Sequence, residues 1–153
     1  MNKVIERARE LVAAGVPFLH QGRDFNGIDC VGCLVYAFEH PLDDVPGYPR
    51  DPYRGELDRQ LARIFGTALQ EAEVTKGGEC LRRINVDELR EGDVVSMQYR
   101  GPVRHVGIIA CHPIYPGHLS LIHTDAMVGK VTEHLLDDMW VDRIVKVYRR
   151  SAV

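Results

Sequence analysis

The sequence has no long hydrophobic run, and no stretch approaches the roughly 20 apolar residues that a membrane-spanning helix needs. Residues 1–10 are charged throughout and lack the apolar segment of a secretory signal. A basic excess is also missing, since 19 Lys and Arg against 22 Asp and Glu give a net charge of −3. This balance disfavours a protein that tracks nucleic-acid phosphates. We therefore expect no membrane insertion, no nucleic-acid partner, and a cytoplasmic location before any assembly.

Cysteine is scarce, with four in 153 residues, and the absence of a signal segment argues against a disulfide scaffold. Each cysteine is then a core residue, a metal ligand or a reactive thiol. The chain is 45% hydrophobic and 27% charged, which is ordinary for a globular protein. No internal repeat or flexible linker divides it. A single domain over residues 1–153 is the expectation.

The first half of the chain predicts helices. Apolar residues at helical spacing predict one helix over residues 4–12 and an amphipathic helix over residues 57–69. Between them, residues 16–29 are rich in Gly, Asn and Asp and predict a loop. Asp29 is well placed to cap a helix that begins at Cys30.

The second half predicts strands joined by short links. Neighbouring strands with short connections pair antiparallel, so the pattern indicates an α+β fold of about five strands with the helices packed on one side. The predicted strands cover residues 95–99, 103–110, 118–124, 130–134 and 143–150.

Cys30 occupies the first position of its predicted helix. Unpaired backbone N–H groups and the helix dipole favour a thiolate there, and the thiolate is the reactive form of cysteine. Three alternatives stay open: a small buried side chain, a redox dithiol with Cys33, or half of a zinc site completed by Cys111 and His112. A redox pair normally follows a strand in a parallel unit, and the zinc spacing is poor. We favour the nucleophile, with Cys33 in the core and with no metal and no cofactor.

Two histidines lie at matching ends of neighbouring predicted strands. If His105 pairs with His123, Ala110 pairs with His118 and residues 111–117 form the loop. The two imidazoles would then share one face, with Cα atoms about 5 Å apart. Such a pair can serve a cysteine nucleophile, one ring taking the thiol proton and the other fixing its tautomer. Separately, each could be an ordinary strand histidine.

The five other histidines fall in loops or near element ends, where most are expected to be solvated: His20, His40, His112, His118 and His134. His20 precedes Cys30 in the loop and could line a cleft.

Together these motifs resemble the NlpC-like cysteine peptidases of bacterial cell-wall metabolism. Asp-Cys-x-Gly at 29–32, Gly-Asp-Val-Val at 92–95, His-Val-Gly-Ile at 105–108 and Ile-His at 122–123 occur in the family's order. Further details resemble the phage-tail branch of that family. They are Gly-Ile-Asp-Cys-Val-Gly at 27–32, Tyr-Pro-Arg-Asp-Pro at 48–52, and Trp140 with Arg143.

The resemblance implies a papain-like α+β fold with Cys30 as nucleophile, His105 as base and His123 as the orienting residue. It also implies that Asp29 contacts the substrate's free amino group, a role compatible with capping the helix. The implied substrate is a peptidoglycan stem peptide cut next to D-glutamate, often before diaminopimelate. Phage tail proteins and a location in the virion tail are the partner and place that the phage-tail branch implies.

The sequence departs from the family pattern in the loop before the nucleophile. Many relatives carry a tyrosine where this chain has Phe18, and phenylalanine cannot donate a hydrogen bond to an oxyanion. The backbone N–H of Cys30 and the side chain of Gln21 are the remaining candidate donors. A long proline-rich insert also covers residues 41–53. These departures favour an alternative, a weak or inactive module of tail assembly that uses its cleft for docking.

Overall fold

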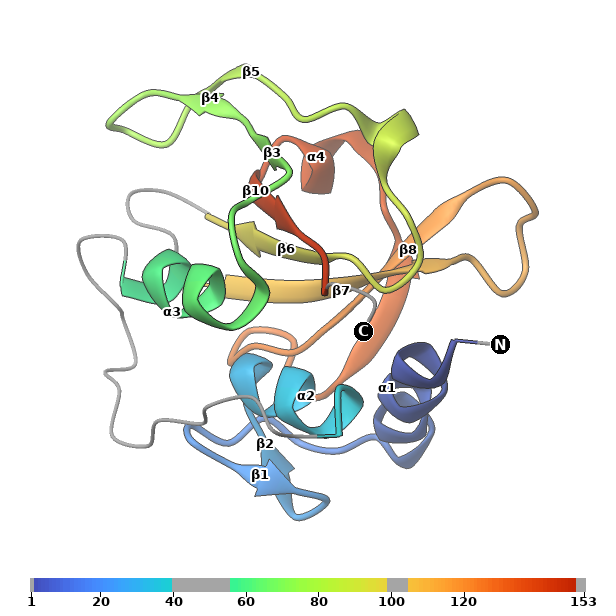
Figure 1. Ribbon diagram of the computed structural model, residues 1–153. Helices are drawn as coiled ribbons and strands as arrows, with labels where there is room; N and C mark the ends of the chain where they lie inside the picture. The colour runs from blue at the N-terminus through green and yellow to red at the C-terminus, as the bar shows by residue number, and fades with distance from the viewer. Residues whose placement is uncertain (1, 40–55, 99–104, 151–153) are drawn as a thin grey trace.

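The computed structural model describes residues 2–39, 56–98 and 105–150, and a six-stranded sheet runs through its middle (Figure 1). Every neighbouring pair in that sheet is antiparallel, which confirms the predicted α+β class. The two-residue strand β3 at one edge adds to the five predicted strands. In spatial order the strands are β3 (Gln70–Glu71), β10 (Ile144–Tyr148), β6 (Val94–Met97), β7 (His105–Cys111), β8 (Leu119–His123) and β9 (Thr132–Leu135).

Three helices cover one face of the sheet, as the sequence predicts (Figure 1). They are α1 (Lys3–Ala14), α2 (Cys30–Ala37) and α3 (Glu56–Phe65). Their apolar sides meet Val106 and Ile108 of β7 in one buried cluster. Burial of this apolar area supplies the main driving force for folding and fixes α2 against β7.

The opposite face is covered by a second layer, of which the sequence predicts only the short helical turn that begins at Asn85. Its buried cluster joins Ile109 and Leu121 of the sheet to Ile84 and Leu89 of the preceding connection. The layer contains the hairpin β4 (Glu73–Val74) and β5 (Cys80–Arg82), a turn of 3-10 helix (Val86–Glu88), and the short helix α4 (Asp138–Val141). The sheet is therefore buried on both sides.

Two local boundaries differ from the sequence predictions. The helix predicted over residues 57–69 ends at Phe65, because Gly66 takes a φ of 89°, and Leu69 beyond it is 53% exposed. The predicted loop before Cys30 contains a small antiparallel hairpin, β1 (Arg23–Asp24) and β2 (Gly27–Ile28).

Some features singled out from the sequence lie outside the described residues: the proline-rich insert, His40, and residues 99, 103 and 104 of the predicted strands. Among the helices that the structure does describe, none combines the length and the apolar character needed to cross a bilayer.

Candidate active site

The start of α2 is fixed by the side chain of Asp29. As predicted, Asp29 is the N-cap residue, and its Oδ1 accepts a hydrogen bond of 2.7 Å from the backbone N–H of Gly32. This bond satisfies one of the donors that a helix start leaves without an intrahelical partner. Cys30 is consequently held at the first position of the helix.

The same carboxylate also organises the loop in front of the helix. Its Oδ2 accepts a hydrogen bond of 2.9 Å from the backbone N–H of Gln21. Its Oδ1 pairs with Nη1 of Arg23 at 2.9 Å. Asp29 is only 3% exposed, so it is a buried, paired charge that joins the loop to α2.

Gly32 allows this loop to lie directly on the helix. A Cβ atom built at Gly32 would lie 2.5 Å from the carbonyl oxygen of Gly22 and 2.6 Å from Cγ1 of Ile28. No side chain fits in that space without moving backbone. The glycine two residues after Cys30 is thus explained by a close approach of two backbone segments.

The thiol of Cys30 lies beside the backbone of Val106 in β7. Backbone N–H groups of Val106 and of Val31 act to lower its pKa. Burial, followed by the negative charge of Asp29, outweighs them and raises the pKa of the Cys30 thiol to about 12. The helix start therefore acts in the expected direction, but burial of the thiol and the anionic capping residue outweigh it.

His105 and His123 are joined by a hydrogen bond of 2.7 Å between His105 Nε2 and His123 Nδ1. The predicted strand register is wrong by two residues. Ile108 pairs with Ile122, and Cys111 with Leu119, so the loop is 112–118. A shift of two residues keeps the face of every side chain, because the side-chain period of a strand is two. The imidazoles meet diagonally on the face where they were expected.

Both of these histidines are buried, at 2% and 1% exposure. Burial lowers the pKa of His105 to about 4, against the opposing effect of the Asp125 carboxylate. Burial, and then repulsion from His105, lowers the pKa of His123 to about 3. At neutral pH both rings are uncharged. Val106, the next residue after His105 in β7, contacts the Cys30 thiol through its backbone, which places the thiol at the same end of β7 as His105.

One group in the described part of the chain could hold a metal ion. His105, His123 and Asp125 bring one ligand atom each to within 4.8 Å of one another. Both nitrogens of His123 already take part in hydrogen bonds to other imidazoles, so a cation bound to His123 would have to displace one of these bonds. The expectation of no metal stays a prediction.

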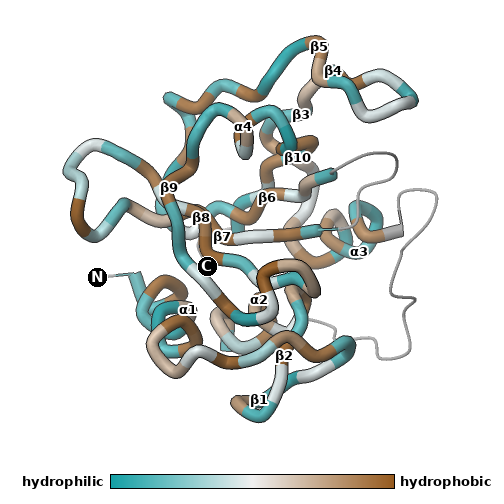
Figure 2. The backbone as a smooth tube through the Cα atoms, turned by 180° about the vertical axis from the view of Figure 1, so that it is seen from behind, coloured by the Kyte–Doolittle hydropathy of each residue, from teal (hydrophilic) through white to brown (hydrophobic). Residues whose placement is uncertain are grey.

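A third histidine, which the sequence analysis placed among the solvated ones, belongs to the site. His134 in β9 is half-buried, and its Nε2 lies 2.7 Å from Nε2 of His123. Its strand lies beside β8 (Figure 2), and in their register His134 lies opposite Leu121. Trp140 of α4 packs on both rings, with centroid distances of 4.8 Å to His123 and 4.9 Å to His134. The spacing of β8 and β9 could have indicated this neighbour.

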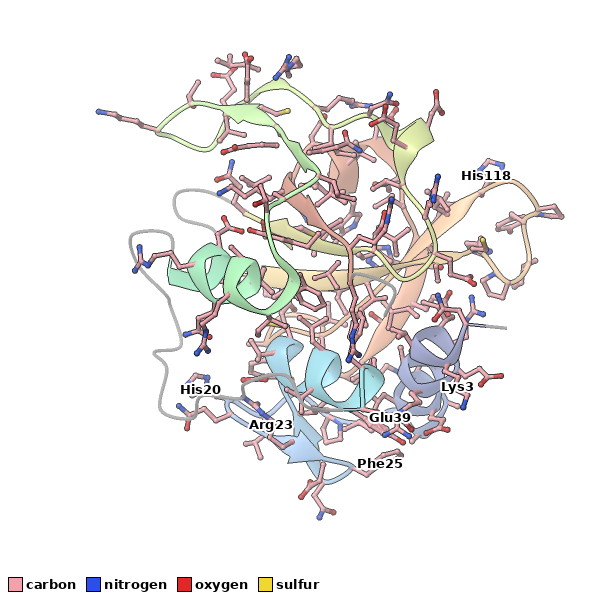
Figure 3. The ribbon with its side chains drawn as sticks, viewed as in Figure 1. Lys3, His20, Arg23, Phe25, Glu39 and His118 are labelled. Carbon is pink, nitrogen blue, oxygen red and sulfur yellow. The ribbon has the colours of Figure 1, made fainter. Side chains whose placement is uncertain are left out.

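The other predicted site residues lie on the loop beside α2. The backbone N–H of Phe18 donates to Gly129 at 2.9 Å, which places it next to the turn that begins at Asp125. Gln21 has a φ of 62° and an exposed side chain, and its backbone serves Asp29. His20 is half-buried on the same loop (Figure 3).

Cys33 is 3% exposed in the core, as predicted.

Comparison with known proteins identifies related molecules. The sequence pattern of the NlpC/P60 family matches residues 15–149. Among solved structures, the NlpC/p60 domain of the peptidoglycan hydrolase SagA has a similar fold. It aligns with a TM-score of 0.51 and 17% sequence identity over 96% of each chain. A search of curated protein sequences finds no match.

Proposed function

The chain belongs to the NlpC/P60 family, and on that premise we propose that it is a cysteine peptidase that cleaves peptidoglycan stem peptides. Cys30 is the nucleophile, His105 the general base and His123 the residue that orients it. The observation that carries this assignment is the 2.7 Å hydrogen bond between two buried imidazoles, beside the strand position whose backbone contacts the Cys30 thiol.

The reaction starts from an uncharged thiol and an uncharged imidazole. Because the pKa of Cys30 is raised and that of His105 is lowered, proton transfer accompanies attack of Sγ on the scissile carbonyl. The acyl group becomes a thioester, and protonated His105 gives its proton to the leaving amine. His105 then deprotonates a water molecule, whose attack releases the peptide acid and restores the thiol.

The oxyanion would lie at the start of α2. The helix presents the backbone N–H of Cys30 and its dipole to the developing negative charge. Phe18 has no hydroxyl group that could donate to the oxyanion, so the backbone N–H of Cys30 is the donor in this proposal.

In this proposal Asp29 is first a structural residue, whereas the resemblance implies that it contacts the amino group of the substrate. Its carboxylate already accepts hydrogen bonds from Gln21, Arg23 and Gly32. Its first role is to hold Cys30 in place. Contact with a substrate amino group requires it to share an oxygen that these donors already use.

The scissile bond that we propose joins D-glutamate to diaminopimelate, and the setting that we propose is a phage or prophage tail. The support is the combination of Gly-Ile-Asp-Cys-Val-Gly around Cys30 with the late pair of Trp140 and Arg143, where the guanidinium lies 4.5 Å from the ring centroid. A tail-associated hydrolase would reach the cell wall by way of the particle. Detection of the protein in purified virions by mass spectrometry tests this part, and its absence there would contradict it.

The test of the activity is hydrolysis of L-Ala-γ-D-Glu-diaminopimelate peptides, followed by mass spectrometry. We expect the full chain to release the fragment ending in D-glutamate and Cys30→Ala to fall to background. Cys111→Ala is the matched control, because Cys111 is exposed at the end of β7 away from α2, and it should retain full activity.

Activity that survives in Cys30→Ala would contradict the assignment of the nucleophile. If the folded wild-type chain cleaves no stem peptide, the docking module becomes the better explanation, and binding of the same peptides would measure it directly.

A further inference from the structure

Three imidazoles form a row across three adjacent strands. His105 lies on β7, His123 on β8 and His134 on β9, three strands that lie side by side (Figure 2), and Trp140 of α4 packs on two of the rings. Two hydrogen bonds of 2.7 Å join them, from His105 Nε2 to His123 Nδ1 and from His123 Nε2 to His134 Nε2. Both nitrogens of His123 are therefore engaged with other imidazoles.

The direction of these hydrogen bonds follows from the last ring. His134 Nδ1 lies 2.9 Å from the backbone oxygen of Leu135, and a carbonyl oxygen can only accept. Nδ1 of His134 thus carries the proton, and in the neutral ring its Nε2 is an acceptor. His123 must then donate from Nε2, which leaves Nδ1 of His123 as the acceptor for an N–H at Nε2 of His105. His105 is left with the proton on Nε2 and an acceptor at Nδ1.

We propose that His134 is a positioning residue that fixes the tautomers of His123 and His105, so that His105 presents an unprotonated Nδ1 for the thiol proton. The assignment of a role to that Nδ1 rests on the proposed function. His134 touches neither the thiol nor the scissile bond in this scheme. The direction of its own hydrogen bond is fixed, because the backbone oxygen of Leu135 can only accept a hydrogen bond from Nδ1 of His134.

Packing against Trp140 holds two of the three rings, those of His123 and His134, in this arrangement. The indole of Trp140 contacts both His123 and His134, and the guanidinium of Arg143 lies 4.5 Å from the centroid of that indole. His123 is 1% exposed, so water does not compete for its nitrogens. A hydrogen bond lost within such a buried pair is not replaced by solvent.

The test reads the tautomers directly, by long-range ¹H–¹⁵N correlation spectra of the imidazole rings in the full chain at neutral pH. We expect Nε2–H in His105 and His123, and Nδ1–H in His134. His134→Leu removes the acceptor, so His105 and His123 should lose their single tautomer. His134→Gln should keep it, because the amide oxygen can accept from His123 while the amide N–H donates to Leu135.

Hydrolysis gives the second readout. His134→Leu should lower kcat about tenfold or more with little change in KM, and the glutamine variant should recover most of that loss. His118→Leu is the matched control. It is an exposed histidine on the β7–β8 loop, outside the row, and should change neither tautomers nor rate (Figure 3).

In the spectra, either of two results would overturn the inference: Nδ1–H on His105 in the wild-type chain, or tautomers that stay unchanged in His134→Leu. A leucine variant with lower kcat that glutamine fails to restore would likewise count against tautomer control. The spectra do not depend on catalysis. An inactive wild-type chain with the expected tautomers would therefore refute the proposed hydrolysis and support the arrangement of the histidine row.

Discussion

Replacing Asp29 by Asn separates the two duties of this residue, capping α2 and setting the charge next to Cys30. Asparagine caps helices as well as aspartate does, so the bond from Gly32 can be kept. The amide cannot accept at both positions. With the amide oxygen at the Oδ1 position, where it accepts from both Gly32 and Arg23, the backbone N–H of Gln21 faces the amide nitrogen and loses its acceptor at a nearly buried site.

The expected cost is that of one buried hydrogen bond to a charged group, about 2 kcal/mol in the free energy of unfolding. For a chain of this length, that corresponds to a fall in Tm of roughly 4–8 °C. The pKa of Cys30 should fall, because the Asp29 carboxylate is one of the causes that raise it. The stability and the thiol reactivity therefore move in opposite directions.

Thermal unfolding followed by circular dichroism measures the fall in Tm. The pH dependence of Cys30 alkylation by iodoacetamide, with the modified cysteine assigned by mass spectrometry, measures the pKa of the thiol. Asp137→Asn is the matched control, because Asp137 caps α4 in the same way but is exposed, and its Tm should be nearly unchanged. An unchanged Tm for Asp29→Asn, or a Cys30 that becomes harder to ionise, would refute this reasoning.

Two further predictions concern packing and pH. Gly32→Ala should destabilise the protein more than Gly107→Ala, as urea unfolding can measure. The new Cβ at position 32 meets the backbone oxygen of Gly22 at 2.5 Å, whereas the one at position 107 meets the movable Cδ1 of Leu121 at 2.6 Å. An equal loss of unfolding free energy in the two variants would contradict this prediction. Stability should also fall as the pH drops from about 6.5 toward 4, by about 1.4 kcal/mol per pH unit for His105 alone. Its folded pKa of about 4 lies below the unfolded value, so the unfolded chain takes up the proton first. A flat stability profile over this interval would refute it.

The sequence predicted the local structure around the nucleophile well. An acidic residue followed by an apolar helical pattern is a local signal, and Asp29 caps α2 as it predicts. The pairing of His105 with His123 was also within reach, since it depends on which face of a strand each residue occupies. The predicted register was wrong by two residues. His118 bonds to His112 rather than pairing with Ala110, so the two strands extend further toward the loop than the sequence indicated.

The state of the thiol could not be predicted in the same way. A helix start favours a thiolate, but the pKa of Cys30 depends on how much water β7 and the loop exclude from it, and on the charge of the cap. His134 was missed for a similar reason. Its sequence neighbours indicate an ordinary exposed strand residue, and its partners come from β8 and α4.

The sequence by itself determined the three main helices and the five long strands, the start of α2 at Cys30, and the face on which each strand side chain lies. These features follow from capping chemistry and from periodicities of 3.6 and 2, which act over a few residues. The tertiary structure alone decided the register of β7 on β8, the second layer over the sheet, and the histidine row beneath Trp140. These depend on burial and on hydrogen bonds between distant segments, where each contribution is set by the packing of all the others.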